Sequence, residues 1–186
     1  MRTAPPFPIA YETRSTIIID KPGGTLSVPS RMGTDDPRRC VGIELQNYLG
    51  HQIWPVHRLD FEVSGLLIFA KTEGSHRRLS RLFESHRITK TYEAFSEAMP
   101  YAPPPSAYVK WESMLHRGKK RTFEAPHGKK AITEAKCLGP VKWNGFSLLR
   151  WELRPLTGRS HQLRYEMAKH GFPILGDKLY GSKKDF

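Results

Sequence analysis

The stretch VHRLDFEVSGLLIFAKT, from Val56 to Thr72, decides how this chain folds and where its chemistry lies. Its apolar run, Leu66 to Ala70, has the composition of a buried strand. Three polar side chains that a core would reject, His57, Arg58 and Asp60, come before that run. We therefore expect a buried strand that the chain enters through a polar loop.

A second strand is predicted upstream of this stretch. The β-branched run Thr16 to Ile19 leads into the turn Lys21-Pro22-Gly23-Gly24. The two glycines let the main chain come close to another group. A phosphate-binding loop is one interpretation, but the GxxxxGK[ST] spacing is absent, so we predict a structural turn.

Three segments have the periodicity of amphipathic helices. RRCVGIELQNYLG places its apolar residues on one face and ends at Gly50. EGSHRRLSRLFESH combines an apolar face with an arginine-rich one, which is either a solvated surface or a contact for a polyanion. In the third segment, SHQLRYEMAKHG, we expect Ser160 to be the N-cap and Gly171 to end the helix.

Two further segments are predicted to be strands. KTYEAFSEA has extended character, and FSLLRWELRP alternates strictly, with Leu149, Trp151 and Leu153 on one side and charged residues on the other. Such alternation is typical of an antiparallel sheet with one face on the core. Because strands outnumber helices and do not alternate regularly with them, we predict an α+β fold with a mainly antiparallel central sheet flanked by helices.

Length and charge limit the classes of protein that fit. The 186 residues suit one domain over residues 1–186, with YAPPPS, Tyr101 to Ser106, as the strongest linker candidate. The 30 lysines and arginines exceed the 18 aspartates and glutamates, so the formal net charge is +12. That charge suits a polyanion such as nucleic acid, and an ordinary basic surface is the alternative.

Cysteine usage and hydropathy argue against metal-binding and membrane proteins. Cys40 and Cys137 lack the spacing of a zinc site or a redox pair, so they are either buried hydrophobic residues or surface thiols, and no metal is expected. Prolines interrupt the N-terminal segment MRTAPPFPIAYETR, and the run Leu66 to Ala70 is too short to cross a bilayer. We therefore expect a soluble cytoplasmic protein that does not associate with membranes.

Three residues have side chains suited to catalysis. Asp60 precedes a strand, Tyr92 lies in a strand flanked by basic residues, and Arg159 lies in the turn before the third helix. A carboxylate can act as nucleophile or base, a phenol can transfer a proton, and an arginine can keep a carboxylate ionised. Spacing alone does not bring the three together, and a structural ion pair with an unrelated tyrosine fits the same residues equally well.

Five segments of the chain resemble, in order, the motifs of one enzyme family. HRLDFEVSGLLIFAKT is similar to the HRLDxxTSGLLxxAK motif of the RluA-type pseudouridine synthases. LTGRSHQLRYEMAKHGFPILGDKLYG resembles the second motif of that family, GR[TS]HQxRxHxxxxGxPIxGDxxYG. KTYEAF, HGKKAITEAKCL and DKPGGTLSVPSR are similar to its KxY, GKxAxTxY and KPxG segments. The resemblance extends over nearly the whole chain.

The resemblance implies an RNA pseudouridine synthase with the catalytic fold of that family. Such an enzyme converts specific uridines of ribosomal or transfer RNA to pseudouridine, by breaking the N1–C1′ bond and reattaching the base through C5, and it needs neither cofactor nor metal. Asp60 matches the catalytic aspartate, Tyr92 the active-site tyrosine, and Arg159 the arginine that pairs with the aspartate. The residues expected to contact RNA are Arg58, which would fill the space left by the flipped base, and His57, Lys119, Lys120, Arg121, Gln162 and Arg164.

The chain departs from the family pattern at several positions. Val63 stands where the family usually has threonine, Tyr165 replaces the commoner valine, and Glu166 replaces the commoner histidine. The chain also ends earlier than family members usually do, and we expect no S4-like RNA-binding domain. Target choice would then come from this one domain, which we expect to act as a monomer.

Two other functions fit part of the pattern. A catalytically silent RNA-binding protein on the same scaffold would suit the charge and the short C-terminus, but a binding module has no use for a carboxylate that faces a polyanion. A metal-dependent nuclease needs clustered carboxylates or histidines, and His57, Asp60 and His161 are too sparse for that. The residues therefore favour the synthase.

Overall fold

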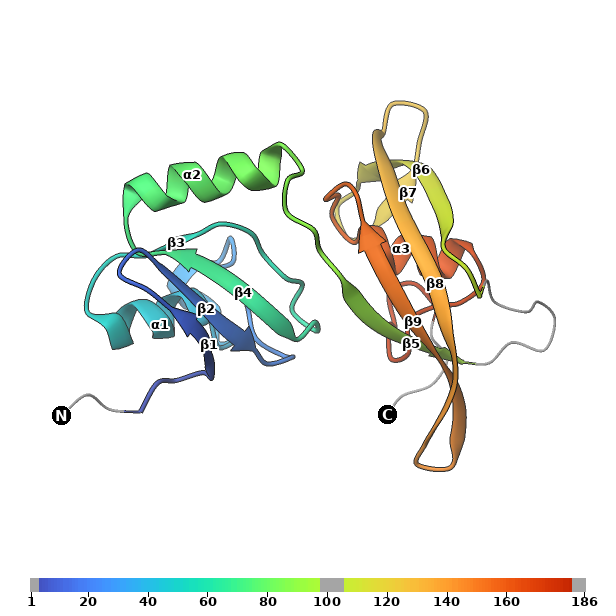
Figure 1. Ribbon diagram of the computed structural model, residues 1–186, viewed down its shortest axis with the longest axis horizontal. Helices are drawn as coiled ribbons and strands as arrows, with labels where there is room; N and C mark the ends of the chain where they lie inside the picture. The colour runs from blue at the N-terminus through green and yellow to red at the C-terminus, as the bar shows by residue number, and fades with distance from the viewer. Residues whose placement is uncertain (1–3, 98–105, 182–186) are drawn as a thin grey trace. The chain divides into compact units, whose positions relative to one another are not determined.

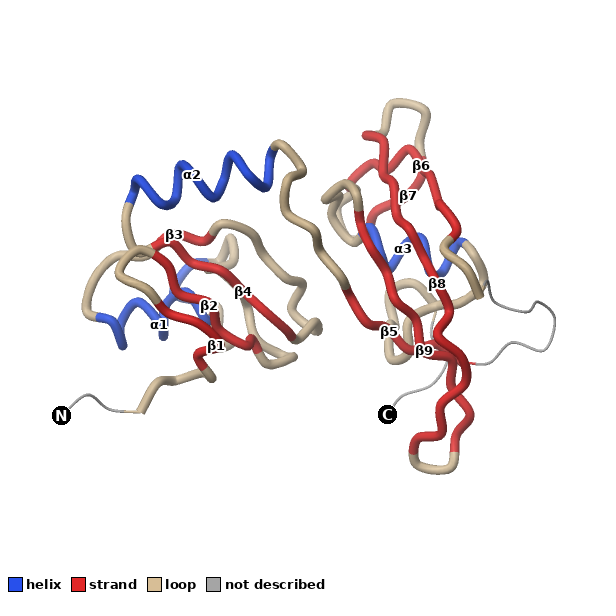
Figure 2. The backbone as a smooth tube through the Cα atoms, viewed as in Figure 1, coloured by secondary structure: helices blue, strands red, loops and turns tan. Residues whose placement is uncertain are grey.

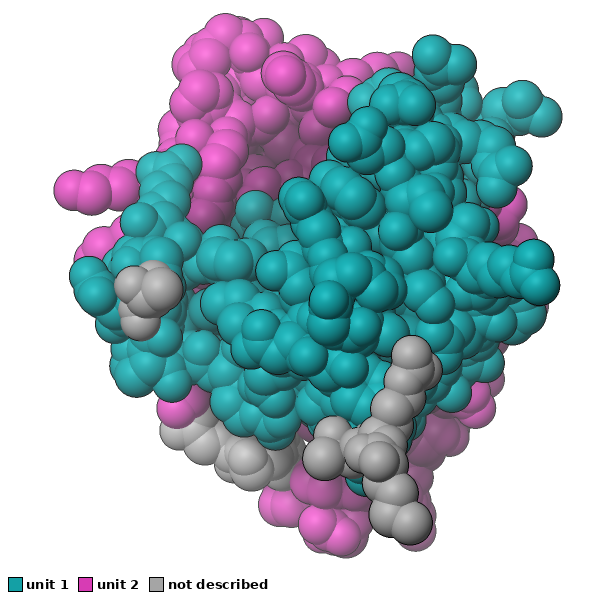
Figure 3. All heavy atoms as spheres, turned by 90° about the vertical axis from the view of Figure 1, so that its left-hand side faces the viewer, with its two compact units in different colours: residues 1–88 teal, residues 89–186 magenta. Residues whose placement is uncertain are grey.

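The computed structural model describes residues 4–97 and 106–181, and the chain divides into two compact units (Figures 1 and 2). Unit 1 covers residues 1–88 and unit 2 covers residues 89–186, and Figure 3 colours them separately. Most of the proposed linker, Tyr101 to Ser106, lies outside the described residues. Each unit has a hydrophobic core of its own, and a single catalytic domain over residues 1–186 stays a prediction.

Unit 1 contains a four-stranded antiparallel sheet in the order β1-β2-β4-β3 (Figure 1). Its strands are β1 Ile9–Glu12, β2 Thr16–Lys21, β3 Trp54–Pro55 and β4 Gly65–Ala70. β2 and β4 are the strands predicted from the two apolar runs, and both predictions are confirmed. They pair from Thr16 opposite Ala70 to Lys21 opposite Gly65, which places the turn after β2 beside the loop before β4.

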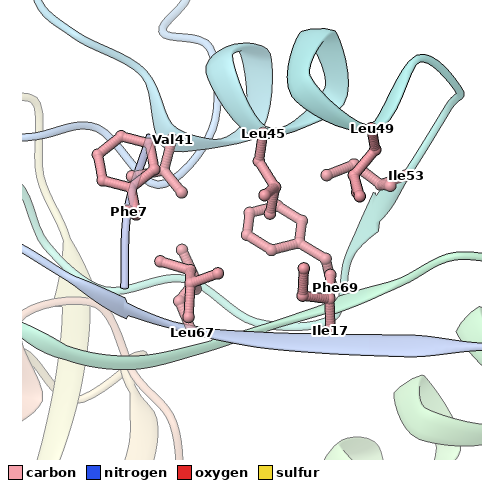
Figure 4. Close-up of a cluster of buried hydrophobic side chains, with 9 residues drawn as sticks. Phe7, Ile17, Val41, Leu45, Leu49, Ile53, Leu67 and Phe69 are labelled. Carbon is pink, nitrogen blue, oxygen red and sulfur yellow. The ribbon is translucent and has the colours of Figure 1, made fainter. Parts of the chain in front are cut away.

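Helix α1, Val41–Leu49, packs its apolar side on one face of this sheet. Figure 4 shows Leu45 pointing from the helix toward Phe69 of β4 and Ile17 of β2, and all three side chains are fully buried. Gly50 follows the helix in the left-handed conformation, with a φ of 72°. The predicted packing helix and its glycine end are therefore confirmed.

Helix α2, Glu73–Glu84, lies on the opposite face of the sheet from α1 (Figures 1 and 4). Thr72 caps it, because its hydroxyl oxygen accepts a hydrogen bond from the N–H of Ser75 at 3.2 Å. A single-turn 3-10 helix, Gly33–Asp35, precedes α1. The arginine-rich face predicted for α2 is exposed and comprises Arg77, Arg78 and Arg81.

Unit 2 contains a five-stranded antiparallel sheet in the order β5-β9-β8-β6-β7. Its strands are β5 Tyr92–Glu97, β6 Val109–Arg117, β7 Thr122–Glu124, β8 Lys129–Trp143 and β9 Phe146–Pro155. β9 alternates as predicted, because Leu149, Trp151 and Leu153 are buried and Arg150 is exposed. The paired strands β8 and β9 continue beyond the other strands as a two-stranded ribbon (Figure 1).

Helix α3, Gln162–Lys169, covers one face of this sheet. Its side chains Leu163 and Met167 join the core around Trp151. The helix stops before Gly171, whose φ of 85° requires a glycine-like conformation, so the predicted end is confirmed.

The prediction that Ser160 caps α3 is wrong. His161 occupies the N-cap position with a φ of 52°, and no side chain caps the helix. The reason is that other elements hold this turn: the carbonyl oxygen of Ser160 accepts a hydrogen bond from Thr122 Oγ1 at 2.8 Å, and the Gln162 side chain accepts one from the N–H of Arg159 at 2.9 Å. The chain therefore enters α3 in a conformation that a simple N-cap pattern does not describe.

The α+β class and the antiparallel sheets predicted from the sequence are confirmed. Every ladder between the named strands is antiparallel, and the described residues of each unit form one sheet. Cys40 of unit 1 and Cys137 of unit 2 are buried free thiols, which decides between the two interpretations of the cysteines. None of the helices in the described part of the chain has the length and hydropathy needed to span a membrane.

Candidate active site

Asp60 lies in the loop between β3 and β4, and both of its neighbours are anchored to the segment after β2. The N–H of Leu59 donates to Ser27 Oγ at 3.0 Å, and that hydroxyl donates to the carbonyl oxygen of Leu59 at 2.8 Å. The carbonyl oxygen of Phe61 accepts a hydrogen bond from the N–H of Gly24 at 2.9 Å. The half-buried Asp60 is therefore presented on a well-anchored loop.

The glycines after β2 allow this close approach. A Cβ atom on Gly23 would lie 3.0 Å from the carbonyl oxygen of Glu62, and Gly24 has a φ of 70°. Main chain therefore packs directly against main chain, as expected of a structural turn.

Lys21 is a fully buried cation beside the Asp60 loop, and the sequence analysis did not identify it. Its Nζ donates hydrogen bonds to the carbonyl oxygens of Pro22 at 3.0 Å, Thr25 at 2.8 Å and Phe61 at 3.3 Å. The last of these bonds reaches the loop that carries Asp60. Lys21 thus connects the end of β2 to the candidate catalytic loop.

The charge of Lys21 also acts on this loop. Burial lowers the pKa of its ammonium group, whereas the carboxylates of Glu62 and Asp60 raise it. Lys21 therefore lies within electrostatic reach of both carboxylates, and Glu62 has the larger effect on it. The sequence contains a signal for it, because alternation in β2 places Lys21 on the same buried side as Ile17 and Ile19. A lysine at such a position needs buried partners.

His57 and Arg58, both predicted to contact RNA, have different surroundings. The His57 ring stacks on Phe83 of α2, with ring centroids 4.8 Å apart, and its Nε2 accepts a hydrogen bond from the N–H of Ile68 at 3.2 Å. His57 therefore joins the loop to α2 and β4. Arg58 is exposed, as a side chain that replaces a flipped base must be. Their contacts with RNA stay predictions.

Tyr92 begins β5 opposite Leu153 of β9, and its side chain packs against the core of unit 2. Just before it, Lys90 donates from Nζ to the carbonyl oxygen of Thr157 at 3.2 Å, and burial lowers the pKa of this ammonium group. The segment that enters β5 is thereby tied to the turn that carries Arg159.

A buried glutamine organises the turn between β9 and α3. Gln162 is 4% exposed, and its Oε1 accepts hydrogen bonds from the Thr157 hydroxyl at 2.8 Å and the N–H of Arg159 at 2.9 Å. Its Nε2 donates to the carbonyl oxygen of Ile132 at 3.0 Å and to Thr133 Oγ1 at 2.9 Å. The amide is thus fully engaged within unit 2, where it holds the turn. The RNA contact of Gln162 stays a prediction.

Arg159 is half-buried, and its Nε donates to the carbonyl oxygen of Lys130 at 2.9 Å. It lines a cavity of about 390 Å³ in unit 2, together with residues from the ends of β6 and β8. Its main-chain N–H is held by Gln162. The structure therefore places Arg159 in a fixed turn at the wall of a cavity.

Arg164, the second arginine of the same motif, is held by a buried aspartate. Its Nε donates to Asp177 Oδ2 at 2.6 Å and its Nη2 to Oδ1 at 2.9 Å, and the two side chains are 13% and 5% exposed. The N–H groups of Leu179 and Tyr180 also donate to Oδ1. Burial alone would raise the pKa of Asp177, but Arg164 and these two amides together hold the pKa below its usual value. The GDKLYG segment therefore orients Arg164.

The basic residues Lys119, Lys120 and Arg121 form the exposed connection between β6 and β7. The N–H of Gly118 donates to the carbonyl oxygen of Arg121 at 3.0 Å and closes this connection as a tight turn. Because Lys119, Lys120 and Arg121 lie at the tip of a loop, a large polyanion can reach them. The contact of these three residues with RNA stays a prediction.

The predicted site residues are divided between the two units. His57, Arg58 and Asp60 share one loop of unit 1, whereas Tyr92, Arg159 and the other expected RNA contacts are in unit 2. Within unit 2, Lys90 connects the segments of Tyr92 and Arg159. The pairing of Asp60 with Arg159 stays a prediction.

Known proteins are similar to this chain over most of its length. The family model described as RNA pseudouridylate synthase matches residues 15–169. Ribosomal large subunit pseudouridine synthase D of Borreliella burgdorferi is 37% identical over 95% of this chain and 55% of its own length. Dual-specificity RNA pseudouridine synthase RluA of Escherichia coli is 34% identical over 94% of this chain and 77% of its own length.

A solved structure has the same fold. Human RNA pseudouridylate synthase domain containing 1 matches with a TM-score of 0.75 and 24% identity, over 97% of this chain and 72% of that one. This chain spans little more than half the length of the pseudouridine synthases D that it matches. The matched residues include the Asp60 loop, Tyr92 and the turn that carries Arg159, and on this basis the chain belongs to the RNA pseudouridylate synthase family.

Proposed function

We propose that this protein is an RNA pseudouridine synthase that acts on uridines of ribosomal or transfer RNA. Relatives named as ribosomal large subunit and dual-specificity RNA pseudouridine synthases support this substrate class. The observation that carries the proposal is the Asp60 loop, which is anchored on both sides of Asp60 and lies in the field of the buried Lys21. A protein that only binds a polyanion gains nothing from a carboxylate held in this way.

The proposed reaction is an isomerisation and needs no co-reactant. The N1–C1′ bond of the uridine breaks, the uracil turns, and a C5–C1′ bond forms, while C5 loses a proton and N1 gains one. We assign the attack on the sugar or on the uracil ring to the carboxylate of Asp60. Tyr92 would stack on the uracil and transfer a proton.

The ionised carboxylate needs a cation, and unit 2 offers two candidates. The resemblance assigns this role to Arg159. We propose Arg164 as the second candidate, because the buried Asp177 fixes its orientation within unit 2 through two of the five N–H donors of the guanidinium. Arg159 instead donates to a main-chain carbonyl and lines a basic cavity.

We further propose that the two units act together as one catalytic domain. A complete set of catalytic side chains needs Asp60 from unit 1 and Tyr92 from unit 2, which supports this view. We also propose that the protein acts as a monomer in the cytoplasm, where ribosomal and transfer RNAs are present.

Two experiments test the function. Pseudouridine mapping of total RNA, with and without the gene, should reveal at least one uridine that is modified only when the gene is present.

Purified Asp60→Asn should then bind that RNA with unchanged affinity and form no pseudouridine. The control Asp20→Asn, which changes an exposed aspartate of β2, should behave as wild type. Turnover of Asp60→Asn within a few-fold of wild type would contradict the role of Asp60. An unchanged pseudouridine map would favour the silent RNA-binding protein.

A further inference from the structure

Unit 2 contains a cavity with a strongly basic lining. Its volume of about 390 Å³ falls within the usual range of small-ligand sites, which begins at about 300 Å³. Arg117, Lys129 and Arg159 line it together with His116 and His127, and none of the described residues that line it carries a carboxylate. The two imidazole rings stand edge to face with their centroids 4.6 Å apart and add ring N–H donors.

The positive charge of this cavity is not neutralised by the carboxylates of the neighbouring strands. Glu112 of β6 pairs with Lys130 at 2.9 Å, and Glu124 of β7 pairs with Lys169 at 3.0 Å. The ion pairs found among the described residues leave out all three cations of the lining. A cavity with this lining attracts an anion.

The walls of the cavity are joined to one another. Thr122 is buried, and it donates from its hydroxyl to the carbonyl oxygen of Ser160 at 2.8 Å and from its N–H to the Tyr180 hydroxyl at 2.7 Å. A Cβ atom on Gly128 would lie 2.5 Å from the main chain of Met114, so this wall is tightly packed. The cations are therefore carried by a framework that exists before a ligand binds.

We propose that this cavity binds a phosphate group of the substrate RNA, through Arg117, Lys129 and Arg159. Guanidinium groups match the geometry of a phosphate and bind it through paired N–H donors. Because Lys90 ties the Arg159 turn to the segment that enters Tyr92, the phosphate belongs to a nucleotide near the target uridine. The choice of RNA as the source of the phosphate rests on the proposed function.

The first test measures phosphate binding without any need for turnover. The imidazole NMR signals of His116 and His127 are followed in the full chain during titration with inorganic phosphate, uridine monophosphate or uridine. The variant is Arg117→Gln combined with Lys129→Gln, and the two single variants serve if the double variant does not fold. The matched control is Lys142→Gln, which removes an exposed lysine at the other end of β8.

We expect phosphate and uridine monophosphate to shift both imidazole signals in a saturable manner, and uridine to shift neither. The shifts should disappear in the double variant and remain in Lys142→Gln. Absence of saturable shifts in the wild-type protein, or their equal disappearance in the control, would overturn the proposal.

The second test identifies the source of the phosphate. The dissociation constant for RNA should rise about tenfold for each cation removed, because each cation donates a charged hydrogen bond to a phosphate. The slope of log affinity against log salt should also become shallower by about 0.7 for each phosphate of single-stranded RNA that the variant no longer neutralises. Uridine monophosphate binding with an unchanged RNA affinity in the variant would indicate a free-nucleotide site and overturn the RNA assignment. If the phosphate titration succeeds and no pseudouridine forms, only the proposed function fails.

Discussion

Lys21 places a positive charge inside unit 1, where a charge is stable only with close polar partners. Three carbonyl oxygens and the Thr25 hydroxyl surround its ammonium group. Because one of these carbonyls belongs to Phe61, the same side chain supports the fold of unit 1 and the position of Asp60.

Replacing Lys21 by Met should destabilise the protein by about 1–3 kcal/mol, because buried carbonyl oxygens would then lack their donor. Urea denaturation measures this change. Amide hydrogen exchange should also accelerate at Gly24, whose N–H bonds to the carbonyl oxygen of Phe61. Arg14→Met, which removes an exposed cation from the same unit, is the control and should change neither quantity. Normal stability of Lys21→Met would show that its hydrogen bonds contribute little.

The two arginines of the second motif can be distinguished by measuring turnover and RNA affinity separately. A cation that faces the reacting carboxylate acts on the chemical step, whereas a cation that contacts a phosphate acts on RNA affinity. We expect a steep loss of turnover at saturating RNA in Arg164→Gln. Arg159→Gln should mainly weaken RNA binding.

The control for this comparison is Asp177→Asn, which removes the partner of Arg164 and keeps the cation. It should lower stability with a smaller loss of turnover. A steep loss of turnover at saturating RNA in Arg159→Gln, with normal turnover in Arg164→Gln, would support Arg159 as the charge partner that the resemblance implies.

At the scale of elements, helix α3 carries an acid in the core of unit 2. Glu166 is fully buried, and neither of its carboxylate oxygens has a hydrogen-bond partner among the described residues, although His170 Nε2 lies 3.7 Å from Oε2. Burial raises the pKa of this carboxyl group, and the nearby Ser113 and Lys169 oppose the shift without cancelling it. The Ser113 hydroxyl accepts a hydrogen bond from Lys169 Nζ at 2.9 Å. The Ser113 hydroxyl therefore lowers the pKa of Glu166 as a nearby polar group.

The raised pKa makes the contribution of Glu166 to stability depend on pH. The folded protein keeps this proton to a higher pH than the unfolded chain, whose glutamates titrate at about pH 4.3. Stability therefore falls as pH rises from that value to the pKa of the folded state, and the deficit persists above it. Glu166→Gln should raise the free energy of unfolding by about 1–3 kcal/mol at pH 8 and by less at pH 4.5.

Urea denaturation at the two pH values checks this prediction. Glu124→Gln is the matched control, because a hydrogen bond from Lys169 lowers the pKa of Glu124. Its folded-state pKa lies below the unfolded value, so its stabilisation is present at neutral pH and is lost as pH falls through the folded pKa. The control should therefore show the opposite sign at pH 8. A destabilised Glu166→Gln at pH 8 would mean that the carboxylate has a stabilising partner.

At the scale of the whole molecule, the net charge of +12 raises the question of whether RNA affinity is diffuse or local. Lys119, Lys120 and Arg121 are concentrated in one exposed connection of unit 2. If this connection contacts phosphates, neutralising it should weaken binding to all RNAs about equally. An ordinary solvated surface would make no such local contribution.

The test compares two triple alanine variants with the same change in net charge. One replaces Lys119, Lys120 and Arg121, and the other replaces the scattered exposed residues Arg14, Arg31 and Lys142. In the first variant, the slope of log affinity against log salt should become shallower by about 0.7 for each single-strand phosphate that is no longer neutralised. In the second variant, the slope should change less. Turnover at saturating RNA should stay normal in both. Equal slopes in the two variants would mean that affinity depends on net charge alone.

The sequence by itself determined the features that depend on neighbours along the chain. Alternation identified β9 and its buried side, and a period near four residues identified the face of α1 that carries Leu45. Gly50 and Gly171 marked helix ends because the left-handed conformation favours glycine wherever it occurs. The ordered motifs identified the family and named Asp60, Tyr92 and Arg159 as candidates. These inferences succeed because side-chain periodicity and backbone conformation are local properties.

Only the tertiary structure decided which polar groups meet. Lys21 bonds to the carbonyl oxygen of Phe61, and the Gln162 side chain bonds to residues of β8 that are remote in the chain. The same long-range packing made His161, and not Ser160, the N-cap of α3, and gave Arg159 and Arg164 different surroundings. A buried polar group needs hydrogen-bond partners, and these often come from segments that are remote in the chain. The spacing of residues in the sequence does not show which remote segments will be neighbours.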